Sequence, residues 1–86
     1  MAYEVRVPED TEKDAKKKFD PPIYERFLKR VKKLEENPKM HGKPLRYPLA
    51  GTWELYFENK FRILYEIDEI NKKVWITGIK HKDEMS

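Results

Sequence analysis

The chain has no cysteine and only three glycines among its 86 residues. Without thiols it offers no disulfide, no zinc–thiolate site and no cysteine nucleophile. No apolar run approaches the roughly 20 residues that a membrane-spanning helix needs, and residues 1–4 lack the apolar stretch of a signal peptide. These absences predict a soluble, cytoplasmic protein that does not associate with a membrane. No residue pattern indicates a metal or an organic cofactor.

Charged and aromatic side chains are abundant instead. Charged residues make up 41% of the chain, aromatic residues 13%, and the formal net charge is +3. A chain of this length forms one domain, residues 1–86. Because a buried aromatic ring removes roughly 150–250 Å² from water, a few large rings must supply most of the core.

The charges are segregated along the chain. Residues 39–49 include Lys39, Lys43 and Arg46 and no acid, residues 52–69 are mostly acidic, and the tail after residue 70 is basic again. This segregation fits either a polyanion-binding patch or ordinary solvated faces.

The first half of the sequence predicts a strand and two helices. Residues 3–7 alternate apolar and charged side chains, as in a half-buried strand. Thr11 and Asp14 have capping-box spacing for a short first helix. Asp20 is suited to cap a second helix, with Pro21 at its first position. An apolar stripe at helical spacing then follows: Ile23, Tyr24, Phe27, Leu28, Val31 and Leu34.

The second half predicts a loop and three strands. Prolines and glycines interrupt residues 38–51, which indicates a loop, and residues 53–58, 61–68 and 73–80 have strand patterns. Their short connections favour antiparallel pairing. The predicted fold is α+β in the order βααβββ: an N-terminal strand, a two-helix hairpin and a three-stranded antiparallel meander.

The pairing of the first two meander strands follows from their alternation. A three-residue loop at 58–60 pairs Phe57 with Phe61 and keeps the apolar side chains of both strands on one face. Tyr56 and Arg62 are then expected to be neighbours on the opposite, non-core face.

The large aromatic residues fall into two groups. Trp53 and Tyr65 lie on the inferred core face, where packing is the expected role. Trp75 has the opposite parity to Val74 and Ile76, so either the tryptophan or the two aliphatic residues face outward. An exposed tryptophan would indicate contact with a protein or RNA partner.

Several short segments in this order resemble the RelE/ParE family of toxins from type II toxin–antitoxin systems. The segments are Lys43-Pro44-Leu45, then Leu49-Ala50-Gly51-Thr52-Trp53-Glu54-Leu55, then Phe61-Arg62-Ile63-Leu64-Tyr65-Glu66-Ile67-Asp68, and His81-Lys82. The resemblance implies a curved antiparallel sheet with a helical hairpin on one face.

The resemblance also implies an activity and partners. RelE-like members enter the ribosomal A site and cleave messenger RNA, using the RNA's own 2′-hydroxyl as nucleophile. The implied activity is therefore that of a metal-independent endoribonuclease that inhibits translation. The implied partners are the ribosome, messenger RNA and a RelB-like antitoxin.

The resemblance assigns expected catalytic roles to four residues. Arg62 matches the family arginine that contacts the scissile phosphate; otherwise it is a surface arginine paired with an acid. Lys82 keeps the charge of the usual arginine but not its bidentate geometry. His81 is suited to proton transfer, or is a solvated histidine. Tyr56 is suited to donate a hydrogen bond or to stack on a base, or it is only a good strand former.

The remaining basic residues near this pattern are candidate RNA-binding residues. They are Lys43, Arg46, Lys60 and Lys80. A charged loop is also often only solvated.

Three departures from the family pattern keep alternatives open. Glu54 and Tyr56 stand where RelE-like enzymes have basic residues, and Ser86 stands where the family has a terminal tyrosine. Glu54 would repel a phosphate unless it acts as a general base. A non-cleaving member, either a ParE-like gyrase inhibitor or a degenerate toxin that only binds its antitoxin, is the first alternative. A small interaction module outside this family is the second.

Overall fold

The computed structural model describes residues 2–46 and 51–84. The elements are β1 (Glu4–Arg6), α1 (Glu9–Lys18), α2 (Pro21–Lys32), the 3-10 helix η1 (Lys33–Glu35), β2 (Lys43–Pro44), β3 (Thr52–Phe57), β4 (Phe61–Asp68), β5 (Lys73–His81) and the 3-10 helix η2 (Lys82–Glu84). This order confirms the predicted α+β arrangement of a strand, a helical hairpin and a meander.

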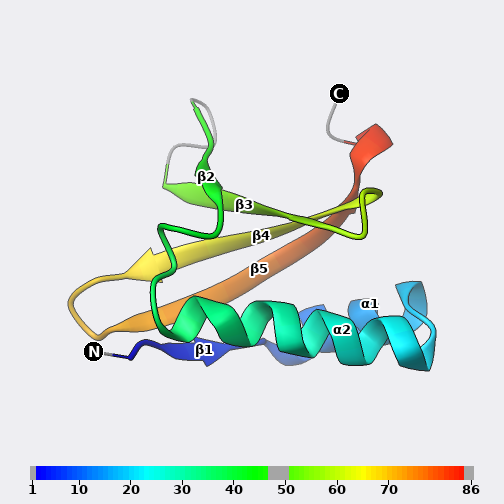
Figure 1. Cartoon of the computed structure of the whole chain (residues 1–86), viewed down its shortest axis with the longest axis horizontal. Helices are drawn as coiled ribbons and strands as arrows, with labels where there is room; N and C mark the ends of the chain where they lie inside the picture. The colour runs from blue at the N-terminus through cyan, green and yellow to red at the C-terminus, as the bar shows by residue number, and fades with distance from the viewer. Residues whose placement is uncertain (1, 47–50, 85–86) are drawn as a thin grey trace.

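The five strands form one sheet in the order β1-β5-β4-β3-β2, with both helices packed along one of its faces (Figure 1). β3, β4 and β5 form the predicted antiparallel meander. β1 pairs parallel with β5: the two helices carry the chain from β1 to the opposite edge of the sheet, and the meander then returns it to lie beside β1. The sheet is therefore mixed, with the N-terminal strand beside the C-terminal one.

The expectation of a continuous loop over residues 38–51 is wrong at one point. Lys43 and Pro44 form β2, which pairs antiparallel with Glu54 and Trp53 of β3. Proline is tolerated here because β2 is at the edge of the sheet. The short strand covers the free edge of β3 and holds the loop against it.

The predicted start is wrong for α1 and correct for α2. α1 begins at Glu9 with Pro8 at its N-cap, so Thr11 is not the cap; it lies inside the helix and is 8% exposed. α2 begins where predicted, with Asp20 at the N-cap position and Pro21 in the first turn, but the Asp20 side chain makes no capping hydrogen bond. The backbone of Pro21 is preset for a helix start, which explains why the second prediction is correct.

The core lies between the helical hairpin and the sheet. It contains Ala15, Phe19, Phe27, Val31 and Leu34 from the helical half and Leu55, Phe57, Ile63, Tyr65, Val74, Ile76 and Ile79 from the strands. The Phe19 ring lies 4.9–5.5 Å from three other phenylalanine rings, as the aromatic content predicted. Leu28 is an exception to the predicted stripe: it is 42% exposed, because it points away from the Phe27 side of α2.

The predicted register of the β3–β4 hairpin is confirmed. Phe57 pairs with Phe61, and Tyr56 pairs with Arg62. The three-residue turn is possible because Glu58 and Asn59 adopt positive φ angles of 53° and 60°. Tyr56 and Arg62 therefore share the face of the sheet opposite the helices.

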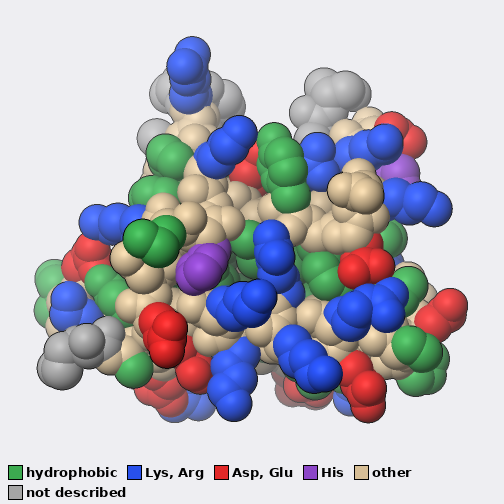
Figure 2. All heavy atoms as spheres, in the orientation of Figure 1, with side chains coloured by type: hydrophobic (Ala, Val, Ile, Leu, Met, Phe, Trp, Pro, Cys, Tyr) green, Lys and Arg blue, Asp and Glu red, His purple; other side chains and the backbone are tan. Residues whose placement is uncertain are grey.

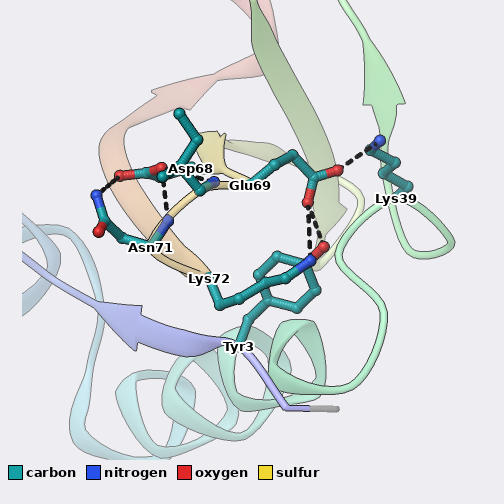
Figure 3. A network of polar contacts seen from close by, with 7 residues as sticks. Tyr3, Lys39, Asp68, Glu69, Asn71 and Lys72 are labelled. Carbon is teal, nitrogen blue, oxygen red and sulfur yellow. Dashed lines mark hydrogen bonds and ion pairs between the residues drawn. The ribbon is translucent and has the colours of Figure 1, made fainter.

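A polar network joins the beginning of the chain to two distant turns (Figure 3). Glu69 in the β4–β5 turn accepts a hydrogen bond from the Tyr3 hydroxyl and forms an ion pair with Lys39 at 2.7 Å. These partners lower the pKa of Glu69, and the hydrogen bond from Lys39 to Glu69 raises the pKa of Lys39. Asp68 orders the turn by accepting the Ile70 amide hydrogen bond at 3.1 Å.

Within residues 2–46 and 51–84, neither helix has both the length and the apolar content to cross a bilayer.

Candidate functional site

The outer face of the sheet, on the side away from the helices, carries a row of polar side chains. Tyr56 on β3 pairs with Arg62 on β4, and Arg62 pairs with Lys80 on β5. Paired residues of neighbouring strands project to the same face of a sheet. The row therefore places an aromatic ring and two cations side by side.

Arg62 is held against Tyr56. The Arg62 guanidinium carbon lies 3.8 Å from the centroid of the Tyr56 ring, and the Lys43 Nζ lies 5.5 Å from the same centroid. Arg62 also donates from Nη1 to the backbone carbonyl of Phe61 at 3.2 Å. Stacking on a ring is a favourable geometry for a guanidinium. The arginine is thus held in place before any ligand binds, while the residue Tyr56 remains 47% exposed.

Glu54 lies one row away on the same face. Lys43 is its cross-strand neighbour on β2, and Leu64 is its neighbour on β4. Glu54 therefore projects from the same face as Lys43 and the Tyr56–Arg62 pair. A carboxylate at this place is suited to accept a proton near a bound phosphodiester.

A groove of about 260 Å³ opens beside Tyr56. Its lining includes Arg30 from α2, His41 from the loop before β2, Lys43 from β2, and Glu54 and Tyr56 from β3. Arg30 and His41 were not among the residues selected from the sequence. The acid-free stretch of residues 39–49 was a signal for His41, whereas Arg30 is brought to the groove only by the packing of α2.

His81 lies on the other side of the sheet from Arg62. It pairs with Phe61, and the two rings are 5.5 Å apart in an edge-to-face arrangement. Its Nδ1 also lies 3.4 Å from the Asp83 carboxylate. Phe61 in turn packs against Phe19 in the core. The structure therefore does not bring the His81 imidazole together with the Arg62 guanidinium.

Lys82 and Lys60 are neighbours at one end of the sheet. The Lys82 amide donates to the Lys60 carbonyl at 2.7 Å, which joins the end of β5 to the β3–β4 turn. Lys60, Lys80 and Lys82 are exposed, and Arg46 is exposed just after β2. Leu49 and Ala50 of the family-like segment, and Ser86 at the position of the family's terminal tyrosine, lie outside the described residues.

Trp75 faces outward, which decides between the two arrangements left open by the sequence. Trp75 is 39% exposed, whereas Val74 and Ile76 are fully buried. It pairs with Glu66 on β4 and Arg6 on β1. The outer face thus has an aromatic residue at each side, Tyr56 on β3 and Trp75 on β5.

The described residues provide cations and rings rather than a metal centre. Among residues 2–46 and 51–84, no three His, Asp or Glu side chains are gathered as metal ligands. The arrangement on the outer face can bind a phosphate through Arg62 and offer the exposed Tyr56 ring to a base.

The chain is similar in sequence and in structure to known toxins of toxin–antitoxin systems. No family model matches the chain. The RelE4 protein of Methanocaldococcus jannaschii is 28% identical over 85 residues, which cover 96% of this chain and 89% of that protein. A chain of the RelBE2 toxin–antitoxin complex from Mycobacterium tuberculosis is 32% identical, with a TM-score of 0.84, covering 94% of this chain and 99% of that one.

A more distant structure shares the fold alone. The YoeB/ParE toxin from Agrobacterium tumefaciens has a TM-score of 0.75 at 13% identity, covering 91% of this chain and 96% of that one. The fold by itself therefore does not determine what such a protein acts on.

Proposed function

Because this chain belongs to the RelE-like superfamily of toxins from toxin–antitoxin systems, we propose that it cleaves messenger RNA at the ribosome and thereby inhibits translation. The observation that carries the proposal is the Arg62 guanidinium, stacked 3.8 Å from the Tyr56 ring centroid on the outer face of the sheet. A fixed cation beside an exposed ring suits a single-stranded RNA, which offers a phosphate and an unstacked base.

The proposed reaction needs little covalent help from the protein. The 2′-oxygen of the RNA attacks the adjacent phosphorus, and the 5′-oxygen of the next nucleotide leaves. The 2′-hydroxyl loses its proton to a base, and the leaving oxygen takes up a proton from an acid. Arg62 stabilises the additional negative charge on the phosphoryl oxygens, and because it is already in place it needs no reorganisation during the reaction.

The other residues have supporting roles in this proposal. Tyr56 holds Arg62 and stacks on a base, and Lys82 contacts a phosphate at the end of β5. Lys43, Arg46, Lys60 and Lys80 bind the RNA backbone. Two groups are candidates for moving a proton: Glu54 beside Lys43, and His81 at the end of β5. Because the His81 ring packs against Phe61, we expect His81 to contribute less than Arg62.

A RelB-like antitoxin is the proposed protein partner. A chain of a toxin–antitoxin complex is among the structures most similar to this one. The exposed Trp75 on the outer face offers an apolar surface for such a partner.

The alternative is a family member that binds without cleaving, either as a ParE-like gyrase inhibitor or as a protein that only binds its antitoxin. Glu54 and Tyr56 favour this alternative, because they occupy positions at which RelE-like enzymes have cations. A carboxylate next to the phosphate site weakens binding unless it is used for proton transfer.

The test is cleavage of messenger RNA on programmed ribosomes, with the new 5′ ends mapped by primer extension. We expect wild-type protein to cut in the A site, Arg62→Ala to be slower by about 10²–10³-fold, and Arg62→Lys to fall in between. Lys17→Ala is the matched control, because Lys17 is an exposed cation on α1, in the layer on the opposite side of the sheet.

Each alternative result has a distinct meaning. Undiminished cleavage by Arg62→Ala would remove Arg62 from the site. Intact messenger RNA together with inhibition of gyrase supercoiling would replace the proposed function with the ParE-like one. Intact messenger RNA without gyrase inhibition, but with antitoxin binding, would identify a degenerate toxin.

A further inference from the structure

Four cations lie on one side of α2 and the 3-10 helix that follows it. Lys29, Arg30 and Lys33 follow Arg26 by three, four and seven residues, which places all four on one helical face. Lys and Arg side chains gather over α2 in the space-filling view (Figure 2). These residues line a groove of about 420 Å³ together with Tyr56, Phe57, Glu58 and Asn59.

Three of these cations lack acidic partners. Arg26 forms a bidentate pair with Glu58 at 3.0 and 3.1 Å. In the described part of the chain, no carboxylate lies within ion-pair distance of Lys29, Arg30 or Lys33. No ion pair therefore cancels these three charges in the groove, although Glu35 and Glu36 line the adjoining hollow beside Lys29 and Lys33.

The neighbouring helix α1 shows the contrast. Its lysines at positions 13, 16 and 18 each form an ion pair with an acid four residues earlier, at 3.3, 3.6 and 3.3 Å. α1 is thus neutralised within itself, as is usual for a solvated helix. Each helix contains four lysine or arginine residues, but three of those on α1 form ion pairs and, among the described residues, only Arg26 does so on α2.

The α2 groove is continuous with the outer face of the sheet. Arg30 and Tyr56 line both the groove beside α2 and the smaller groove that contains His41 and Lys43. Tyr56 also carries the stacked Arg62 guanidinium. An RNA strand bound at Arg62 can therefore extend to the α2 cations along the protein surface.

We propose that Lys29, Arg30 and Lys33 form a second RNA-binding site, which holds the phosphodiester backbone of RNA outside the cleavage centre. The positive charge suits a polyanion, and the exposed Tyr56 ring at the edge of the groove favours RNA over an acidic peptide, since every base can stack on it. The inference builds on the RNA-directed function proposed above, but it concerns equilibrium binding and requires no cleavage.

The test measures binding of a fluorescent single-stranded RNA with 2′-O-methyl groups, which lack the nucleophile for cleavage. The variant is the triple substitution Lys29→Gln, Arg30→Gln, Lys33→Gln in the full chain. The matched control, Lys13→Gln, Lys16→Gln, Lys17→Gln on α1, removes the same charge from exposed positions. The dissociation constant is determined over a range of salt concentrations.

We expect the α2 triple variant to bind about tenfold more weakly or worse, and the slope of log K against log salt to fall by about 2, since each lost phosphate contact removes about 0.7. The α1 triple variant should keep a slope near the wild-type value. The single variant Lys29→Gln, with a slope change of about 0.7, provides a second reading should the triple variant fold poorly.

Equal weakening by both triple variants would overturn the proposal, because it would reflect net charge alone. Unchanged RNA binding with weakened binding of the antitoxin would also overturn it, and would assign the groove to a protein. If wild-type protein does not cleave on ribosomes but the α2 variant still binds RNA more weakly, the cleavage proposal fails and the second RNA site stands.

Discussion

Tyr65 is the buried residue that connects the core to the functional face. Its hydroxyl donates to the Pro38 carbonyl at 2.6 Å, and its ring stacks on Trp53 with the centroids 6.4 Å apart. Residues 38–42 are thereby held against the sheet, and this loop carries His41 into the groove beside Tyr56. The arrangement of the groove thus depends on a residue that does not line it.

The Tyr65→Phe variant tests this connection. Removing the hydroxyl leaves the Pro38 carbonyl without its donor in a buried place, so we expect a loss of about 1–3 kcal/mol in the free energy of unfolding. Urea denaturation of wild type and variant measures the difference. A variant as stable as wild type would mean that solvent replaces the lost donor.

The same variant should change the dependence of stability on pH. Burial raises the pKa of Tyr65 to about 12, above the ordinary value of 10.0. The folded state therefore favours the neutral phenol, and this contribution is fully present below pH 10 and is lost as the pH rises toward 12. The decline between pH 10 and 12 should be shallower for Tyr65→Phe than for wild type.

Two residues of the site show what alternation in the sequence can and cannot predict. The Tyr56–Arg62 pair follows from period-2 alternation and a three-residue turn, and the structure confirms it. The side on which His81 lies does not follow, because an irregularity between Leu64 and Tyr65 shifts the pairing of β4 with β5. Strict alternation from Ile76 would place His81 outside, whereas the shifted register pairs it with Phe61.

At the scale of elements, β2 depends on one glycine. A Cβ atom on Gly42 would lie 2.6 Å from the Glu54 carbonyl oxygen and would collide with the Tyr65 hydroxyl. Only a glycine allows the loop to approach β3 so closely before β2 begins. The sequence did not indicate this strand, because a two-residue strand that includes a proline carries no periodicity.

We expect Gly42→Ala to destabilise the protein by about 1–3 kcal/mol, because backbone atoms of β3 must move to accept the methyl group. Gly78→Ala is the matched control, since an added Cβ there meets nothing within 4 Å and φ is not positive. Its effect should stay within about 0.5 kcal/mol. Thermal and urea unfolding of the two variants measure the contrast, and equal effects would show that the close approach at Gly42 is unimportant.

At the scale of the whole molecule, β1 forms one edge of the sheet by pairing with β5. Glu4 pairs with Lys73, and Arg6 pairs with Trp75, in parallel register. The alternation of residues 3–7 predicted a strand but not its partner, because the partner lies almost 70 residues away. Most of the residues that predicted the family lie in the meander β3–β4–β5, where neighbours in sequence are also neighbours in space.

The Glu69 network is expected to stabilise the pairing of β1 with β5. Glu69 contacts Tyr3 before β1, Lys39 in the loop and Lys72 before β5. Because the Glu69 side chain is 45% exposed, its removal should act locally rather than on global unfolding. The Glu4 amide, which donates to the Lys72 carbonyl at 2.8 Å, reports on the junction.

We expect Glu69→Ala to speed hydrogen exchange of the Glu4 amide, measured by NMR, while the urea midpoint changes little. Glu66→Ala, which removes an exposed carboxylate from the outer face of β4, is the control and should leave this amide unchanged. Because its partners lower the pKa of Glu69, the protection in wild type should be lost only as the pH falls through that lowered pKa. Exchange of the Glu4 amide that is unaffected by Glu69→Ala would show that backbone pairing alone holds β1 against β5.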